Sequence, residues 1–228
     1  MKKLGMAGNE AEHLLEAAIV KVDAWKGQIR YRPVSGGISN TNFQIEVEGA
    51  SHGFFVKSPG RGTEMFIDRK AARAASRQAE TIGVGPKTFD YLDHEGIEIA
   101  EVVADRRPST HADFVDPAVR AETVRLYRLF HQAPRLPLTK TVFDMIDEHD
   151  DQVRRLGGFL PEDHDWLTWQ YRQARAALEA AGLDLVPCFN DPMPGNFLLG
   201  ADKSIVLIDF EYASNNDRLY DLAIWAGE

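Results

Sequence analysis

Cysteine is almost absent from this chain of 228 residues, because Cys188 is the only one. No intrachain disulfide is therefore possible, and neither a Cys/His zinc pattern nor a cysteine-based redox motif can be built. Long apolar runs are missing as well, since Glu10, Glu12 and Glu16 interrupt the N-terminal segment before it reaches the length of a signal peptide or a membrane span. These absences predict a soluble, unexported protein of the reducing cytoplasm, without membrane insertion.

Positive charge is also in deficit. Lysine and arginine number 26 against 35 acidic residues, which gives a formal net charge of -9. A chain with this balance repels nucleic acid and anionic membranes, whereas a small cationic substrate would be attracted. Repeats and low-complexity tracts are absent, and 44% hydrophobic with 27% charged residues is typical of a globular protein with one large domain or two modest lobes.

Two apolar runs, at 185–188 and 204–208, predict short buried strands, and an aspartate follows each of them, Asp191 and Asp209. The two carboxylates should therefore meet at one edge. Two prolines and a glycine between them exclude a helix, so Asn196 should lie close behind Asp191 on a stiff turn. The alternative is a pair of surface strands with polar loops.

Phosphoryl transfer needs a set of this kind. One carboxylate accepts the proton of the attacking hydroxyl, and an amide oxygen and a second carboxylate hold Mg²⁺ on the nucleotide phosphates. The pattern therefore predicts Asp191 as the catalytic residue and Asn196 and Asp209 as the metal ligands.

The N-terminal part contains a candidate nucleotide loop. Strands are predicted at 29–34 and 43–47, and the glycine-rich link between them could bring backbone N–H groups close to phosphate oxygens. A plain hairpin turn is the alternative, but the next predicted strand ends in a lysine, whose ammonium could reach the nucleotide phosphates. The residues assigned to the nucleotide here are Gly37, Ser39, Asn40, Phe43 and Lys57.

Helical periodicity covers much of the remaining chain. A helix at 10–22, capped by Asn9, is expected to pack, and lone His131 is expected to pack rather than catalyse. Trp166 and Trp169 are predicted to pack in a core, with an aromatic box for a quaternary ammonium as the alternative. Further helices are predicted at 66–82, 116–131, 143–156 and 161–181, and further strands at 87–91 and 97–103.

The sequence resembles the choline/ethanolamine kinase family, within the wider group of aminoglycoside-phosphotransferase-like and protein-kinase-like enzymes. The segments IDFEYA at 208–213 and YDLA at 220–223 carry the resemblance, and GGISN at 36–40 and VKSPG at 56–60 are similar to the same family. The resemblance, from about residue 33 to the end, implies an α+β, protein-kinase-like fold of two lobes. These are a small antiparallel-sheet N-lobe at 1–103 and a mostly helical C-lobe at 104–228, incomplete at its end.

The activity that the resemblance implies is ATP-dependent, Mg²⁺-assisted phosphorylation of the hydroxyl of a small amino alcohol, with choline first and ethanolamine second. Backbone groups of a hinge near Glu101 and Val103 would bind adenine, and Asp221 would brace the catalytic loop. The residues assigned to the substrate are Asp191, Glu211 and Glu228.

Three departures from the family pattern limit these expectations. Ala72 stands where a glutamate should pair with Lys57, which predicts a lysine without its usual partner, and Phe189 replaces a histidine that braces the catalytic loop. The sequence stops at Glu228, so the far wall of an acceptor pocket and the cover of the last helix are expected to be missing, as in a fragment, a shortened paralogue or one half of an assembly.

Two other interpretations stay open. The acceptor could be an aminoglycoside or another hydroxylated amine, because the acceptor pocket is the part cut short. The chain could also be a catalytically impaired, nucleotide-binding homologue, as Ala72 and Phe189 suggest. The oligomeric state is left open as well.

Overall fold

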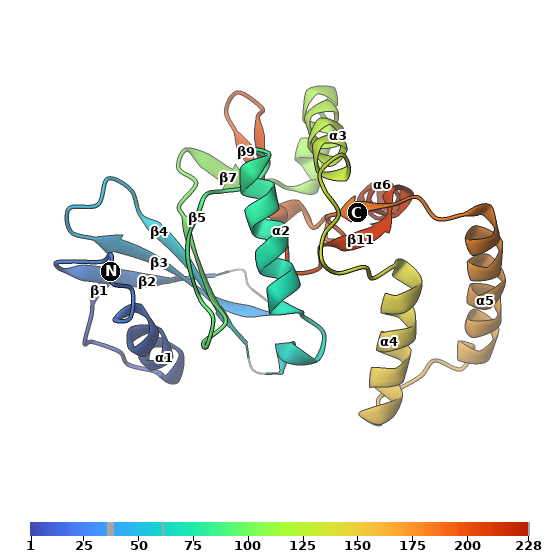
Figure 1. Ribbon diagram of the computed structural model, residues 1–228, viewed down its shortest axis with the longest axis horizontal. Helices are drawn as coiled ribbons and strands as arrows, with labels where there is room; N and C mark the ends of the chain where they lie inside the picture. Colours follow the sequence, from blue (N-terminus) through green and yellow to red (C-terminus); the bar gives the residue numbers. More distant parts are fainter. Residues whose placement is uncertain (36–38, 61, 228) are drawn as a thin grey trace.

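The computed structural model describes residues 1–35, 39–60 and 62–227, so the predicted contributions of Gly37 and Glu228 lie outside the described residues. Within these ranges the N-terminal part of the chain contains a six-stranded antiparallel sheet with the strand order β1-β2-β3-β4-β6-β5 (Figure 1). This part, up to residue 103, is called the N-lobe below, and the part from residue 104 is called the C-lobe. Its strands are β1 (Lys2–Lys3), β2 (Ile29–Val34), β3 (Asn40–Val47), β4 (Phe54–Pro59), β5 (Thr88–Leu92) and β6 (Ile97–Glu101). The predicted antiparallel sheet in the N-terminal part is confirmed.

Alternation along the strands gives this sheet one buried face and one face turned to the C-lobe. Phe43 and Ile45 of β3 and Val56 of β4 are fully buried in a core that also takes Leu15 and Ile19 of α1 (Glu10–Ile19). The predicted cap of α1 is present, because the Asn9 side chain accepts a hydrogen bond from the Glu12 amide. Successive residues of a strand point to opposite faces, so residues 42, 55 and 57 are left for the other face.

Helix α2 (Arg69–Thr81) lies between the sheet and the C-lobe (Figure 1). Asp68 caps it by accepting hydrogen bonds from the amides of Lys70 and Ala71. Ala75 and Ala79 of α2 are buried in a second core, which is formed mainly by the C-lobe. The helix therefore attaches the two lobes to each other.

The C-lobe combines helices with short antiparallel strand pairs. Its helices are α3 (Pro117–His131), α4 (Val142–Arg155), α5 (His164–Ala181) and α6 (Arg218–Gly227). The strands β7 (Arg106–Pro108), β9 (Phe197–Gly200) and β10 (Ile205–Leu207) form one small sheet, and β8 (Leu185–Cys188) pairs with β11 (Ser214–Asp217). Short 3-10 helices are η1 (Thr63–Met65), η2 (His111–Val115) and η3 (Pro194–Asn196).

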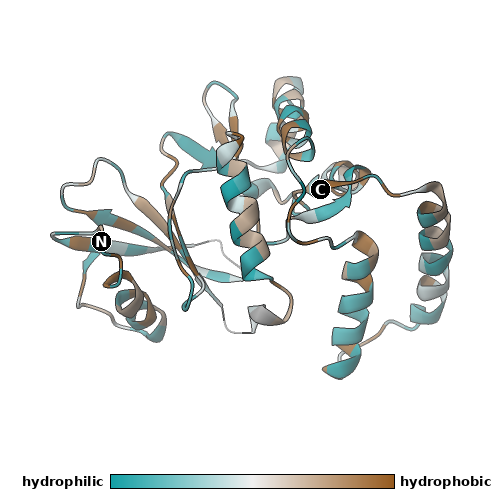
Figure 2. Ribbon diagram, viewed as in Figure 1, coloured by the Kyte–Doolittle hydropathy of each residue, from teal (hydrophilic) through white to brown (hydrophobic). Residues whose placement is uncertain are grey.

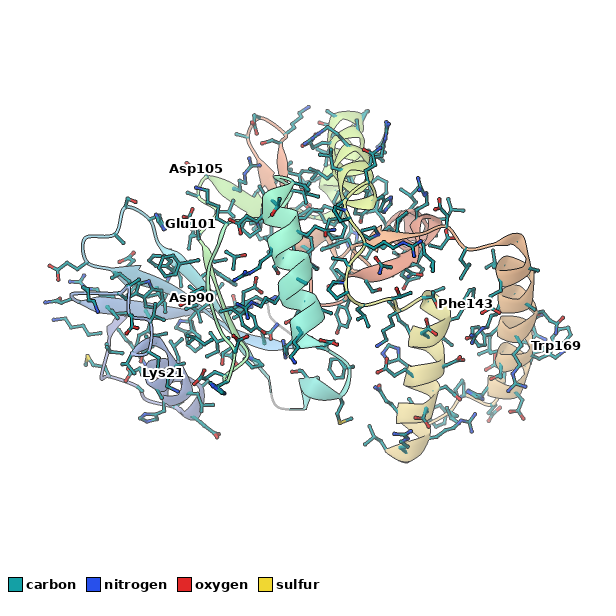
Figure 3. The ribbon with its side chains drawn as sticks, viewed as in Figure 1. Lys21, Asp90, Glu101, Asp105, Phe143 and Trp169 are labelled. Atoms are coloured by element: carbon teal, nitrogen blue, oxygen red, sulfur yellow. The ribbon has the colours of Figure 1, made fainter. Side chains whose placement is uncertain are left out.

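The predicted packing of α5 in a core is wrong. Trp166 and Trp169 are each 57% exposed, and no residue of α5 is buried among those that the structure describes. Figure 3 shows Trp169 on the outer side of the helix, and Figure 2 shows that the neighbouring α4 is largely hydrophilic beyond its first turn. The helix is held to α4 by polar contacts, such as the Tyr171 hydroxyl donating to the Phe143 carbonyl at 3.0 Å. Helical spacing placed the apolar residues on one side, but α4 contacts that side through Tyr171, and Leu167 and Leu178 stay exposed.

Helix α6 is less exposed than predicted. Leu222 and Trp225 pack against the C-lobe core, and only part of the apolar face, including Leu219, is open. None of the described helices combines the length and the apolarity that crossing a membrane requires.

Candidate active site

A cavity of about 400 Å³ lies between the N-lobe sheet and the small sheet of the C-lobe. It brings together the predicted residues Lys57, Asn196 and Asp209, and the hinge residues Glu101 and Val103 also line it. The remaining walls are largely apolar, with Phe55, Ala100, Leu198, Ile208 and Phe210 among them. A mostly apolar concave site with a few convergent polar groups is the usual form of a cofactor pocket.

The hinge offers backbone groups to this cavity. The Glu101 amide donates to the Lys87 carbonyl and the Val102 amide to the Gly53 carbonyl, whereas the Val103 amide has no backbone partner among the described residues. Residues 101 and 103 direct their amides to the same edge of the strand. A free hinge amide in an apolar cavity is suited to a hydrogen bond with a flat heterocycle.

Asp191 and Asn196 are in direct contact, as their spacing predicts. The Asn196 side-chain amide donates to the Asp191 carboxylate at 2.9 Å and to the Asp191 carbonyl at 3.1 Å. The short η3 turn between them supplies the stiffness that the prolines and glycine predict. Burial, reinforced by the charge of Asp209, raises the pKa of the Asp191 carboxyl to about 6. The carboxylate is therefore a stronger base than an exposed aspartate.

Asp209 follows β10 in a left-handed backbone conformation, with φ of 70°. Non-glycine residues seldom adopt this conformation, and such strain gathers at functional sites. The conformation accompanies a close approach to the N-lobe, where Lys57 Nζ donates to Asp209 Oδ1 at 2.6 Å and lies 3.6 Å from Glu211 Oε1. Lys57 thus has no acidic partner on α2, as Ala72 predicts, but carboxylates of the C-lobe take that place.

The charge of Lys57 is held by its neighbours. Burial works against the charged ammonium, but the carboxylates of Asp209, Glu211 and Glu98 outweigh burial and raise the Lys57 pKa. The lysine is thus a fixed positive charge in the lining of the cavity.

Glu211 lies at the centre of a network that joins the lobes. It accepts hydrogen bonds from Ser39 Oγ at 2.9 Å, Asn40 Nδ2 at 2.7 Å and Arg69 Nη1 at 2.8 Å. Burial alone would raise its pKa, but Lys57 and these donors lower it. Ser39 and Asn40, assigned to phosphate from the sequence, bind a carboxylate in this structure instead. Arg69 was missed, because a single arginine in the first turn of a helix carries no recognisable pattern.

The Ser39 segment is positioned by a close backbone contact. The Gly60 amide donates to the Ser39 carbonyl at 2.9 Å, and a Cβ at position 60 would lie only 2.6 Å from that oxygen. Only glycine permits this approach without a shift of the chain. Glycine at position 60 therefore holds the start of β3 against the end of β4.

The assignment of Phe43 to the nucleotide is wrong. Phe43 is buried in the N-lobe core beside Tyr31, on the face of β3 that points away from the cavity. Its neighbour Asn42 lines the cavity instead, and the Asn42 Oδ1 atom is buried without a hydrogen-bond partner among the described residues. A one-residue step reverses the face on which a side chain lies. A buried acceptor of this kind is left for a water molecule or for a donor group of a ligand.

Asp221 braces the loop that carries Asp191, in agreement with its expected role. It is fully buried and accepts hydrogen bonds from the amides of Phe189 at 2.9 Å and Asn190 at 2.7 Å, while His131 Nε2 lies 2.8 Å from its carboxylate. Phe189 itself is buried and packs against Phe197 and Phe210. The loop is held through its backbone and by aromatic packing, which offsets the absence of a histidine at 189.

His131, Cys188 and Asp221 lie close enough together to suggest a metal site. The hydrogen bonds to the Asp221 carboxylate already use both of its oxygens. Burial raises the pKa of the Cys188 thiol far above its usual range, so the thiol stays protonated and is a poor metal ligand. The cluster is structural.

The oxygen donors of the main cavity fit a magnesium ion better. The side-chain nitrogen of Asn196 is hydrogen-bonded to Asp191, which leaves the side-chain oxygen of Asn196 available as a metal ligand. Asp209 adds a carboxylate, and both residues line the same cavity. Hard oxygen donors of this type are those that Mg²⁺ prefers. Asn196 and Asp209 are thus the residues that would hold the ion.

Known structures and sequences support the architecture. The fold matches choline kinase LicA from Streptococcus pneumoniae with a TM-score of 0.77 at 19% identity, covering 94% of this chain and 73% of that one. A LicA structure in complex with AMP gives a TM-score of 0.76 at 20% identity, covering 96% and 74%. These likenesses confirm the predicted α+β, protein-kinase-like fold.

Sequence comparison gives the same relationship. Protein LicA of Haemophilus influenzae is 24% identical over 194 residues, covering 82% of this chain and 55% of that protein. The chain thus spans about half the length of this relative. The profile described as "Phosphotransferase enzyme family" matches residues 30–226, from β2 into α6, including every described residue of the cavity discussed above. This protein belongs to the phosphotransferase enzyme family.

Proposed function

We propose that this protein is an ATP-dependent phosphotransferase that phosphorylates the hydroxyl of a small amino alcohol, choline in the first place and ethanolamine in the second. The observation that carries the proposal is the convergence of Lys57 and Asp209, 2.6 Å apart, with Asn196 in the same cavity and Asp191 bound to Asn196 at 2.9 Å. A base, two oxygen donors and a fixed cation are the parts that phosphoryl transfer requires.

The nucleotide is assigned to the cavity. Its apolar walls and the free Val103 amide suit an adenine ring, and Lys57 in its lining suits the phosphates. The complex of the similar LicA structure with AMP supports this assignment. Mg²⁺, when bound, would neutralise phosphate charge.

Asp191 is assigned to the acceptor hydroxyl. Its pKa of about 6 means that the carboxylate is mainly ionised at neutral pH but still basic enough to accept a proton. Asn196 orients the carboxylate through its amide hydrogen bond. The chain's own contribution is therefore to hold the base in one orientation beside the metal ligands.

Magnesium dependence is the direct test of the metal ligands. Calorimetry should show tighter ATP binding with Mg²⁺ than with EDTA, because Asn196 and Asp209 gain a shared cation between themselves and the phosphates. Asp209→Asn should remove most of this difference, whereas Asp165→Asn, a fully exposed aspartate of α5, should retain it. Equal affinity with Mg²⁺ and with EDTA in the unaltered protein would contradict the metal assignment.

The acceptor is tested with a substrate panel. ADP release should be fastest with choline, slower with ethanolamine and slowest with an aminoglycoside, because the similar LicA structure is that of a choline kinase. The net charge of -9 attracts all three cations and does not decide between them. Preferential turnover of the aminoglycoside would favour the broader phosphotransferase alternative. Nucleotide binding without turnover of any acceptor would favour an impaired homologue.

A further inference from the structure

Three side chains form a row across the strands on the cavity face of the N-lobe sheet. Lys57 of β4 lies opposite Asn42 of β3 and opposite Glu98 of β6, and all three line the cavity. Directly opposite residues of antiparallel strands project to the same face. The backbone spacing between Lys57 and Glu98 is therefore set by the sheet itself.

Glu98 also borders a second, much smaller cavity. This cavity measures about 10 Å³, and Lys57, Ala72 and Ser76 line it together with Glu98. Such a volume holds roughly one water molecule. The small side chain of Ala72 leaves space on the helix side of Lys57, and the acid nearest to that space on the sheet is Glu98.

Lys57 and Glu98 favour each other's charged form. The Glu98 charge is one of those that raise the Lys57 pKa against the effect of burial. Burial raises the pKa of Glu98, and the Lys57 charge and the Ser76 hydroxyl oppose that rise. The ammonium is nevertheless bound to Asp209 in this structure.

Under the proposed function Asp209 has two binding partners, the Lys57 ammonium and the metal ion. An oxygen that binds a metal ion has less negative charge to offer an ammonium, so Lys57 loses much of this partner when a metal–nucleotide complex enters. Asp209 and Glu211 belong to a C-lobe segment, whereas Glu98 shares the sheet of Lys57. A lysine side chain is flexible enough to turn from one carboxylate to its neighbour.

We propose that Glu98 is a positioning residue that holds the Lys57 ammonium once Asp209 is engaged. Ala72 on α2 has no carboxylate to pair with Lys57, so Glu98 of the neighbouring strand β6 supplies one. The effect of Glu98 on nucleotide binding rests on the proposed function. The coupling between the Glu98 and Lys57 side chains does not depend on it.

The first test is Glu98→Gln, which keeps the shape and removes the charge. The dissociation constant and the KM for Mg²⁺-ATP should each rise roughly tenfold, the effect of losing one charge-assisted contact, with a smaller change in kcat. Glu46→Gln, an exposed glutamate of β3, is the matched control and should leave both values unchanged. A Glu98→Gln protein that binds Mg²⁺-ATP as tightly as the unaltered protein would overturn the proposal.

A second-site test separates positioning from general damage. Glu98→Ala with Ala72→Glu places a carboxylate on the other side of Lys57 and should recover most of the ATP affinity that Glu98→Ala loses. Ala72→Glu alone should instead weaken binding, because a third carboxylate would enter a cavity of about 10 Å³ that Glu98 and Glu211 already line. We therefore expect Ala72→Glu to lower the ATP affinity of the unaltered protein and to raise the ATP affinity of the Glu98→Ala protein. If Ala72→Glu has the same effect in both backgrounds, with thermal melting showing folded proteins, Glu98 does not position Lys57.

A third measurement does not need nucleotide. In urea unfolding without nucleotide, a double-mutant cycle of Lys57→Met and Glu98→Gln should give a non-zero coupling free energy, because the two side chains lie opposite each other on β4 and β6. Additive effects of the two substitutions would refute the coupling. If the unaltered protein bound no ATP but the cycle still showed coupling, the proposed function would fail while the Lys57–Glu98 coupling remained.

Discussion

Replacement of Asp191 by asparagine is expected to lower kcat by roughly 10²–10⁴-fold while nucleotide affinity changes little. Asp191 acts only when the acceptor hydroxyl is present, and its hydrogen bond from the Asn196 amide can be kept by the asparagine carbonyl oxygen. ADP release under saturating substrates and ATP calorimetry measure the two effects. Asp165→Asn, which removes an exposed carboxylate from α5, is the control and should keep the original rate.

The same substitution is expected to stabilise the metal-free protein. The folded-state pKa of Asp191 lies at about 6, above its usual value of 3.8, so its contribution to stability is complete below the lower value and is lost as pH rises through the higher one. At neutral pH the ionised carboxylate is therefore a cost, on the order of 1–3 kcal/mol, which asparagine avoids. Thermal melting with EDTA at pH 7.5 should show a higher Tm for Asp191→Asn. Retention of the original turnover, or a lower Tm, would show that Asp191 has been misassigned.

Replacement of Asp221 by alanine is expected to be the most destabilising single change considered. The substitution leaves the amides of Phe189 and Asn190 and the ring of His131 without their buried acceptor. Removal of one member of a buried ion pair or charged network typically costs roughly 3–5 kcal/mol, a large part of the stability of an ordinary domain. Urea unfolding followed by fluorescence should show a much lower midpoint.

Two further variants sharpen this test. Asp221→Asn keeps an acceptor oxygen and should lose less stability than Asp221→Ala. Asp151→Ala removes an exposed partner of Arg155 and should change the free energy of unfolding by at most about 1 kcal/mol. If Asp221→Ala unfolded at the same urea concentration as Asp151→Ala, the catalytic loop would be held by the packing of Phe189 alone.

Local sequence was enough to predict the parts of the site that lie near one another along the chain. Asp191 and Asn196 are five positions apart, with prolines between them, so their contact follows from the stiffness of the turn. The same applies to the helix cap Asn9, which acts within one turn. The pairing of Asp221 with the loop at 189–190 was reached through family resemblance, since no local rule connects the two segments.

Contacts between distant segments were decided by the tertiary structure. Lys57 and Asp209, and Arg69 and Glu211, meet because α2 attaches the sheet to the C-lobe, and neither pair has a sequence signature. Ala72 showed only that Lys57 lacks its usual partner, because the sequence does not show which other carboxylates share the cavity of Lys57. The role of Asn42 rather than Phe43 likewise depends on which face of β3 is covered by α1.

Periodicity determined that α5 is a helix with its apolar residues on one side, but periodicity does not reveal whether another element lies against that side. The structure leaves Leu167 and Leu178 of that side exposed, and Trp166 and Trp169 outside it are exposed as well. Backbone preferences and turn chemistry act over a few residues, and the sequence by itself therefore determined the elements, the turns and the Asp191–Asn196 pair. Burial and charge pairing depend on the free energy of the whole packed chain, so only the tertiary structure decided the partners of Lys57 and Glu211 and the exposure of α5.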